Sequence, residues 1–104
     1  MVVTKIIVLF NLQADADAAA YERWARETDL PVVNKLGSVE KFEVFRTTGT
    51  LAGDASPYQY VEVLDVSSVD ALLADAGSDL MQKVATEFQA FADNPTFILT
   101  ENLQ

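Results

Sequence analysis

Four segments of the chain carry the hydrophobic pattern of β-strands. The first, residues 2–12, is rich in Val and Ile and contains one charge, Lys5. The others are residues 38–47, 58–66 and 96–103. Alternate side chains of a strand point to opposite faces of a sheet, and the first and last segments are apolar on both faces. The sequence therefore predicts a sheet that needs cover on both faces.

The second predicted strand has two distinguishable faces. Strict alternation assigns one face to Phe42, Val44 and Arg46, and the other to Lys41, Glu43 and Phe45 together with Val39. In the third predicted strand, Tyr60 and Glu62 lie two residues apart and therefore share a face.

A helical pattern runs from about residue 18 to residue 28. Its inward stripe has 3-4-3 spacing and consists of Tyr21, Trp24, Ala25 and Thr28. The charged residues Glu22, Arg23, Arg26 and Glu27 are assigned to the outer face. Pro31 predicts that the helix ends by Leu30, because proline disfavours helical geometry in the residue before it. A further turn over residues 32–36 is expected to stop at Gly37.

A second, longer helical pattern follows the third strand. Ser67-Ser68-Val69-Asp70 resembles a capping box and predicts its start. Gly77-Ser78 is expected to divide it into a short piece and a longer one, and Asn94-Pro95 to stop it. The element order is then β-α-β-β-α-β, which is the split βαβ arrangement of ferredoxin-like folds.

This order predicts an α+β fold with a four-stranded antiparallel sheet and helices on one face. We expect a single domain over residues 1–104. Because the helices leave one apolar sheet face bare, the economical cover is a second copy of the chain. The sequence therefore predicts a homodimer, a dimeric α/β barrel, whose two sheets face each other.

Composition narrows the chemistry. The chain has 104 residues with a net charge of −9, and it contains no Cys and no His. Disulfides, thiolate or histidine catalysis and the usual zinc sites are excluded, so proton transfer must use Asp, Glu, Tyr, Lys or water. The acidic balance disfavours nucleic-acid and membrane partners. The longest apolar run, residues 6–10, is far too short to span a membrane. We expect a soluble, cytoplasmic protein without a metal.

Four stretches resemble the REDY-like (HapK-type) family of the dimeric α/β-barrel superfamily. They are KIIVLFNL (5–12), TDLPVVNKLGSVEKFEVFRTTG (28–49), PYQYVEVLDV (57–66) and MQKVATEFQAFADNPTFILTENL (81–103). The resemblance places the chain beside the EthD-like, Dabb and antibiotic-biosynthesis monooxygenase families. It implies a pocket between sheet and helices and no cofactor. REDY-like members occur in tripyrrole-pigment and related pathways, where they are regarded as helpers of cyclisation or condensation.

Asp29, Tyr60 and Glu62 are the candidate proton carriers. Asp29 is placed at a helix end, where the helix dipole disfavours a carboxylate. A phenol and a carboxylate on one sheet face could form an acid–base pair. The alternatives are a solvated turn for Asp29 and, for Tyr60 and Glu62, a polar pair at the dimer interface. Glu62 could also form an ion pair with Lys41 or Arg46.

Three further residues are candidate substrate contacts. Arg46 and Asn11 could hold a developing oxyanion, and Trp24 could stack on an aromatic substrate. The alternatives are that Arg46 reaches solvent, that Asn11 satisfies loop backbone and that Trp24 is ordinary core. If Arg46 is covered, its guanidinium needs an anion, namely Asp29, Glu62 or a substrate oxygen.

The predicted function is that of a cofactor-independent small-molecule enzyme. It would cyclise, condense or isomerise a hydrophobic aromatic, pyrrole-like or polyketide-like metabolite. The sequence leaves two alternatives open: a non-catalytic dimeric module that binds a small molecule, and a cofactor-free monooxygenase.

Overall fold

Four antiparallel strands and the helices beneath them make up residues 4–104, the part of the chain that the computed structural model describes. The elements, in chain order, are β1 (Thr4–Leu12), α1 (Ala18–Trp24), the π-helix η1 (Ala25–Asp29), α2 (Leu30–Asn34), β2 (Val39–Arg46), β3 (Tyr60–Val66), α3 (Val69–Ala76), α4 (Asp79–Phe91) and β4 (Ala92–Leu99). The first two residues of the predicted first strand, 2 and 3, lie outside the described part.

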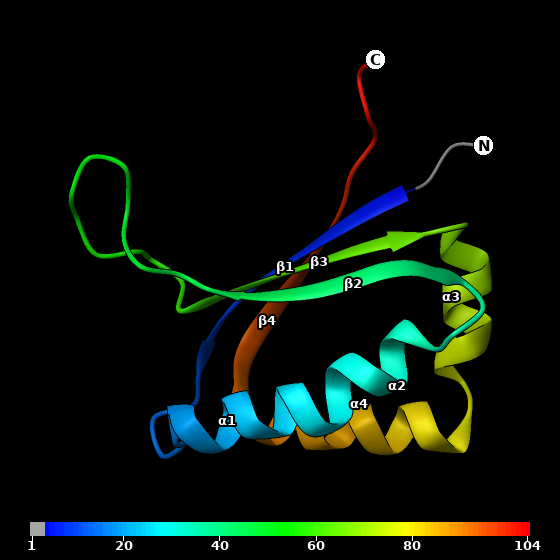
Figure 1. Ribbon diagram of the computed structural model, residues 1–104, viewed down its shortest axis with the longest axis horizontal. Coiled ribbons are helices and arrows are strands. Elements are labelled where there is room, and N and C mark those ends of the chain that lie inside the picture. Colours follow the sequence, from blue (N-terminus) through cyan, green and yellow to red (C-terminus); the bar gives the residue numbers. More distant parts are fainter. Residues whose placement is uncertain (1–3) are drawn as a thin grey trace.

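The strands form one sheet in the order β2-β3-β1-β4, and every neighbouring pair is antiparallel. All helices lie on the same side of this sheet, with α3 standing at one end and leading into α4 (Figure 1). The ferredoxin-like α+β fold predicted from the sequence is confirmed. So are the start of α3, which Ser68 caps, and the helix break at residues 77 and 78.

The core lies between the sheet and the helices. Ile6, Val8 and Phe10 of β1 point into it, and Tyr21 of α1 is completely buried against them. The opposite face of the sheet is uncovered and carries an apolar patch beside the ion pairs Lys5–Asp65 and Lys41–Glu43. The members of this patch are Ile7, Leu9, Phe45, Val61, Val63 and Ile98, which are half-buried or exposed. We call these six residues the open face.

The sequence predicted that the first helix ends by Leu30, before Pro31, and this prediction is wrong. It continues through η1 into α2 as far as Asn34. The N–H of Leu30 bonds to the carbonyl of Ala25, five residues back. This wider turn shifts the hydrogen-bond register just before Pro31, which has no N–H to donate. The π turn thus lets the helix pass the proline, and Asp29 lies inside a continuous helix.

The face assigned to Val39 is also wrong. Val39 is buried, on the same side as Phe42, because the register between β2 and β3 shifts between Val39 and Lys41. A bulge of this kind inserts one extra residue and reverses the alternation on one side of it.

The last strand begins four residues earlier than predicted. Chain direction changes at Ala92, directly after α4, rather than at Asn94-Pro95. Asn94 adopts a left-handed conformation with φ of 45°, which asparagine tolerates better than most residues, and so stays within the strand. Opposite it, the pairing of β1 with β4 shifts between Leu9 and Asn11.

Candidate functional site

Two buried carboxyls line a small apolar cavity between the sheet and the helices. Asp29 comes from η1 and Glu62 from β3, and their exposed fractions are 5% and 4%. The cavity has a volume of about 180 Å³ and is partly open to the surface. Its walls are otherwise apolar and include Phe42, Met81, Phe88 and Phe97. We call this space the carboxyl cavity.

Both carboxyls of the carboxyl cavity hold their protons unusually tightly. Burial raises the pKa of Asp29 to about 7. Burial, together with the negative charge of Asp29, raises the pKa of Glu62 to about 8. A charged carboxylate in an apolar wall has lost its water, and two neighbouring carboxylates repel each other. Near neutral pH, each of these groups can therefore both take up and release a proton.

Burial, and not a helix dipole, disfavours the charged form of Asp29. The sequence analysis placed this residue at the negative end of a helix dipole, but the helix continues past it. Burial is the cause instead. Among the described residues, no hydrogen bond to the Asp29 carboxyl is formed. Glu62 accepts one hydrogen bond, from the hydroxyl of Tyr21, with 3.4 Å between the oxygens.

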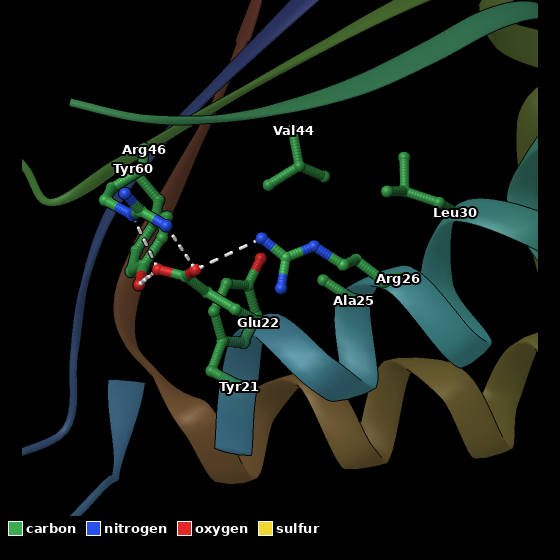
Figure 2. Close-up of a pocket in the computed structure, with 8 residues that line it drawn as sticks. All are labelled: Tyr21, Glu22, Ala25, Arg26, Leu30, Val44, Arg46 and Tyr60. Carbon is green, nitrogen blue, oxygen red and sulfur yellow. Dashed lines mark hydrogen bonds and ion pairs between the residues drawn. The ribbon is translucent and has the colours of Figure 1, made fainter. Parts of the chain in front are cut away.

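A second cluster lies nearby and is built around Glu22. Arg46 donates two hydrogen bonds to its carboxylate, from Nε at 2.8 Å and from Nη2 at 2.6 Å. The Tyr60 hydroxyl donates a third at 2.7 Å, and Arg26 forms an ion pair at 3.5 Å. Figure 2 shows the Glu22 carboxylate pointing between Arg46 and Tyr60 on one side and Arg26 on the other. These groups line a cavity of about 220 Å³, which we call the arginine cavity.

The partners of Glu22 fix its ionisation. Hydrogen bonds from Arg46 and Tyr60 lower the pKa of Glu22 to about 2. Burial and the hydrogen bond to Glu22 raise the pKa of Tyr60 to about 12. Glu22 is thus an anion and Tyr60 a neutral phenol across the physiological range. The charges in this cluster therefore pair with one another, and neither Glu22 nor Tyr60 changes its own charge near pH 7.

The expected pairing of Tyr60 with Glu62 is not the one found. Both side chains do share a face of the sheet, as predicted, and it is the face that the helices cover. Each, however, bonds to a residue of α1: Tyr60 to Glu22 and Glu62 to Tyr21. The two α1 residues were missed by the sequence analysis. Tyr21 was assigned to the core, and Glu22 to the outer face.

Asn11 and Trp24 lie outside both cavity linings. The Asn11 amide donates to the carbonyl of Pro57 and accepts from the N–H of Gln59, so it ties β1 to the loop before β3. The Trp24 indole donates to Glu87 at 3.0 Å, and its ring lies between Tyr21 and the phenylalanines of α4. Their substrate contacts stay predictions.

Neither a metal cluster nor a membrane-spanning helix occurs in residues 4–104. No three acidic side chains there lie close enough together to hold a metal ion. None of the helices in that range has the length and apolar character that crossing a bilayer requires.

A model of the family described as "REDY-like protein HapK" matches residues 4–103, which is nearly the whole chain. The chain belongs to the REDY-like HapK family. The resemblance of the four sequence stretches to this family is thereby confirmed. No curated protein gives a significant match to the chain.

Solved structures place this family member among proteins of one fold. HapK from Hahella chejuensis is 28% identical, with a TM-score of 0.80, and the match covers 96% of this chain and 92% of that one. A dimeric protein of unknown function with a ferredoxin-like fold from Bacteroides fragilis is 14% identical, with a TM-score of 0.71 and 96% of each chain covered.

A third structure is an enzyme. SnoaB from Streptomyces nogalater, a cofactor-independent oxygenase solved as a mutant, is 14% identical, with a TM-score of 0.77. The match covers 98% of this chain and 94% of that one. At this identity the likeness establishes the fold and not the reaction.

Proposed function

We propose that this family member is a cofactor-independent enzyme that moves a proton on a small hydrophobic metabolite during cyclisation, condensation or isomerisation. The observation that carries this proposal is the carboxyl cavity, an apolar space in which the ionisable groups are two buried carboxyls. A general acid or base works best when its pKa lies near the working pH. The pKa values of Asp29 and Glu62, about 7 and about 8, meet that condition.

The roles of the two carboxyls follow from their positions. Glu62 lies on a central strand and accepts a hydrogen bond from the hydroxyl of Tyr21. Asp29 lies inside the helix and accepts no hydrogen bond from the described residues, so its carboxyl can bond to a ligand. We assign the first proton transfer to Glu62 and the return or relay of that proton to Asp29. Arg46 and Tyr60 line the arginine cavity, and their roles require a substrate that extends into it.

Turnover of a co-purified metabolite tests this proposal. Native mass spectrometry of freshly purified protein identifies a bound small molecule, which is then incubated with wild-type protein and with Glu62→Gln and Asp29→Asn. Each substitution keeps the side-chain shape but removes the proton-carrying group. We expect turnover to fall by roughly 100-fold or more in each variant. Glu40→Gln, an exposed position on β2, is the matched control and should turn over normally.

The other outcomes are equally informative. If both carboxyl variants turn over the metabolite at the wild-type rate, the proton-transfer roles are wrong. If wild-type protein binds the metabolite and leaves it unchanged, the chain is a binding module rather than an enzyme.

We also propose that two copies of the chain pack sheet against sheet through the open face. Uncovered apolar surface of this kind marks interaction sites, and the dimeric Bacteroides fragilis relative has the same fold. Val63 lies in the middle of the open face, on central strand β3. Analytical ultracentrifugation should therefore find a wild-type dimer and a Val63→Lys monomer. Leu73→Lys, on exposed helix α3, should remain dimeric; a wild-type monomer at micromolar concentration contradicts the proposal.

A further inference from the structure

The charges around the carboxyl cavity are one-sided. Asp29 and Glu62 are its ionisable lining residues, and no Lys or Arg is among the described residues that line it. Arg46 and Arg26 line the arginine cavity instead, where both pair with Glu22. A buried carboxylate is normally compensated by a cation or by several hydrogen bonds. This cavity supplies no cation and one long hydrogen bond, so the two carboxyls retain their protons near neutral pH.

The hydrogen-bonding capacity of the two carboxyls is also largely unused. A carboxylate offers about four acceptor positions. Glu62 uses one of them, for the Tyr21 hydroxyl at 3.4 Å. Asp29, which is 5% exposed, accepts no hydrogen bond from the described residues. A ligand that donates hydrogen bonds can use these open acceptor positions, whereas an anionic ligand would meet two carboxyls and no cation in the lining.

The remaining walls define the body of such a ligand. Three aromatic rings, from Phe42, Phe88 and Phe97, line the space. The negative faces of aromatic rings attract organic cations. An apolar cavity of about 150 Å³ is known to hold one benzene molecule, so about 180 Å³ suits one ring with a short substituent.

We propose that the carboxyl cavity binds an organic cation, with a protonated nitrogen between Asp29 and Glu62 and a single apolar ring against the phenylalanines. This deepens the proposed function, because it names the ligand class of the same cavity. It rests on that cavity being the ligand site, but it does not require that the ligand be converted.

Proton linkage gives the proposal a distinctive signature. The ionisable groups that line the cavity are Asp29 and Glu62, and the hydroxyl of Tyr21 is bonded to Glu62. The lining parts of β2, α3, α4 and β4 carry no ionisable side chain. Burial raises the pKa of Tyr21 far above its usual value, so this phenol stays protonated. Cation binding must then displace protons from the two carboxyls, and affinity should rise with pH until both are ionised.

Isothermal titration calorimetry with three matched probes tests this directly. Benzylamine is a cation throughout the range, benzyl alcohol is neutral and benzoate is an anion. We expect benzylamine to bind most tightly and benzoate most weakly. Between about pH 6 and about pH 8, benzylamine affinity should rise by roughly tenfold and proton release should accompany binding, while benzyl alcohol should show no such rise.

Variants locate the probe and keep the test independent of folding. Asp29→Asn should weaken benzylamine binding by roughly tenfold and remove part of the proton release. Glu62→Gln should do the same if Asp29→Asn fails to fold by circular dichroism. Glu40→Gln should bind like wild type. Equal or tighter binding of benzoate, or benzylamine binding that ignores both carboxyl variants, would overturn the proposal.

The inference and the proposed enzyme can fail separately. Carboxyl-dependent benzylamine binding by a protein that converts no metabolite supports the ligand class and refutes catalysis. Glu62-dependent conversion of a neutral or anionic metabolite, with no benzylamine binding, supports catalysis and refutes the ligand class.

Discussion

Glu22 and Glu62 are the same residue type on the same side of the sheet, yet their pKa values are shifted in opposite directions. The pKa of Glu22 is lowered to about 2, whereas that of Glu62 is raised to about 8. Both are largely covered: the side chain of Glu22 is 17% exposed and Glu62 is 4% exposed. The difference therefore lies in what surrounds each carboxyl as well as in how deeply it is buried.

The surroundings of Glu22 supply positive charge and donors. Arg46 binds it through two nitrogens and Tyr60 through its hydroxyl, so the anion is fully compensated. The surroundings of Glu62 supply apolar walls, one long hydrogen bond and a second carboxyl, Asp29. A paired carboxylate organises its neighbours, and an uncompensated one becomes a proton carrier. This contrast is why the catalytic proposal rests on the carboxyl cavity.

The largest effect we expect is on how fold stability depends on pH. Asp29 and Glu62 have folded pKa values above their unfolded ones, so the folded state binds more protons between about pH 4 and about pH 8. The contribution of these two groups to the free energy of unfolding should thus be largest near pH 4. It should fall by roughly a few kcal/mol as the pH rises to about 8. The double variant Asp29→Asn/Glu62→Gln should lose most of this fall.

Urea denaturation at a series of pH values, at one protein concentration, measures this. Glu40→Gln should keep the wild-type slope. A double variant with the same slope as wild type would mean that the two carboxyls do not hold their protons in the folded state.

The next effect concerns the paired carboxylate. Arg46→Met removes the two strongest bonds to Glu22, and the pKa of Glu22 should rise from about 2 toward its ordinary range. Glu22 stabilises the fold above its unfolded pKa and loses this effect as pH falls toward the folded one, so the variant should lose acid resistance. Carbon-detected NMR titration of Glu22 measures the shift, with the exposed Lys83→Met as control. If the pKa of Glu22 stays at about 2 in this variant, Arg46 is not the cause of its low value.

A smaller effect should follow from Tyr60→Phe. This change deletes one hydrogen bond to Glu22 and keeps the ring that stacks on Phe10. The pKa of Glu22 should rise less than in Arg46→Met, since Arg46 remains in place. We expect a stability loss of about 1 kcal/mol, typical of one hydrogen bond. Thermal denaturation checks the loss, and the same NMR titration must rank the two variants in this order.

The fold and the sheet face of several site residues could be predicted from the sequence, because they depend on local patterns of residues. Period-two and period-3.6 patterns predicted the element order and placed Tyr60 and Glu62 on one sheet face. Arg46, on the face toward the helices, was expected to need an anion if covered. What local patterns do not contain is which distant residue meets which. Arg46 pairs with Glu22, from a different element, rather than with Asp29 or Glu62, and its side chain still reaches solvent.

The errors have specific physical causes. Glu22 was assigned to the outer face because helical periodicity gives only the direction of the Cβ atom. The long side chain of Glu22, beside the buried Tyr21, can turn back toward the sheet. The helix was ended at Pro31 because a π turn leaves no mark in the hydrophobic pattern. Two observations in the sequence could have indicated Glu22. Arg46 was expected to need an anion, and Glu22 directly follows Tyr21, which was assigned to the core.

The smallest effect we expect is on the pKa of Glu62. The direction of this pKa change shows whether Tyr21 acts on Glu62 by hydrogen bonding or by excluding water. Tyr21→Phe removes the only hydrogen bond that Glu62 accepts from the described residues, and that bond lowers the pKa of Glu62. The variant should therefore raise the pKa slightly above about 8, because a 3.4 Å bond is long and weak. NMR titration of Glu62 measures it, with Tyr58→Phe on the exposed loop as control. A fall would mean that the phenol acts on Glu62 mainly by excluding water, since its loss would then rehydrate the carboxylate.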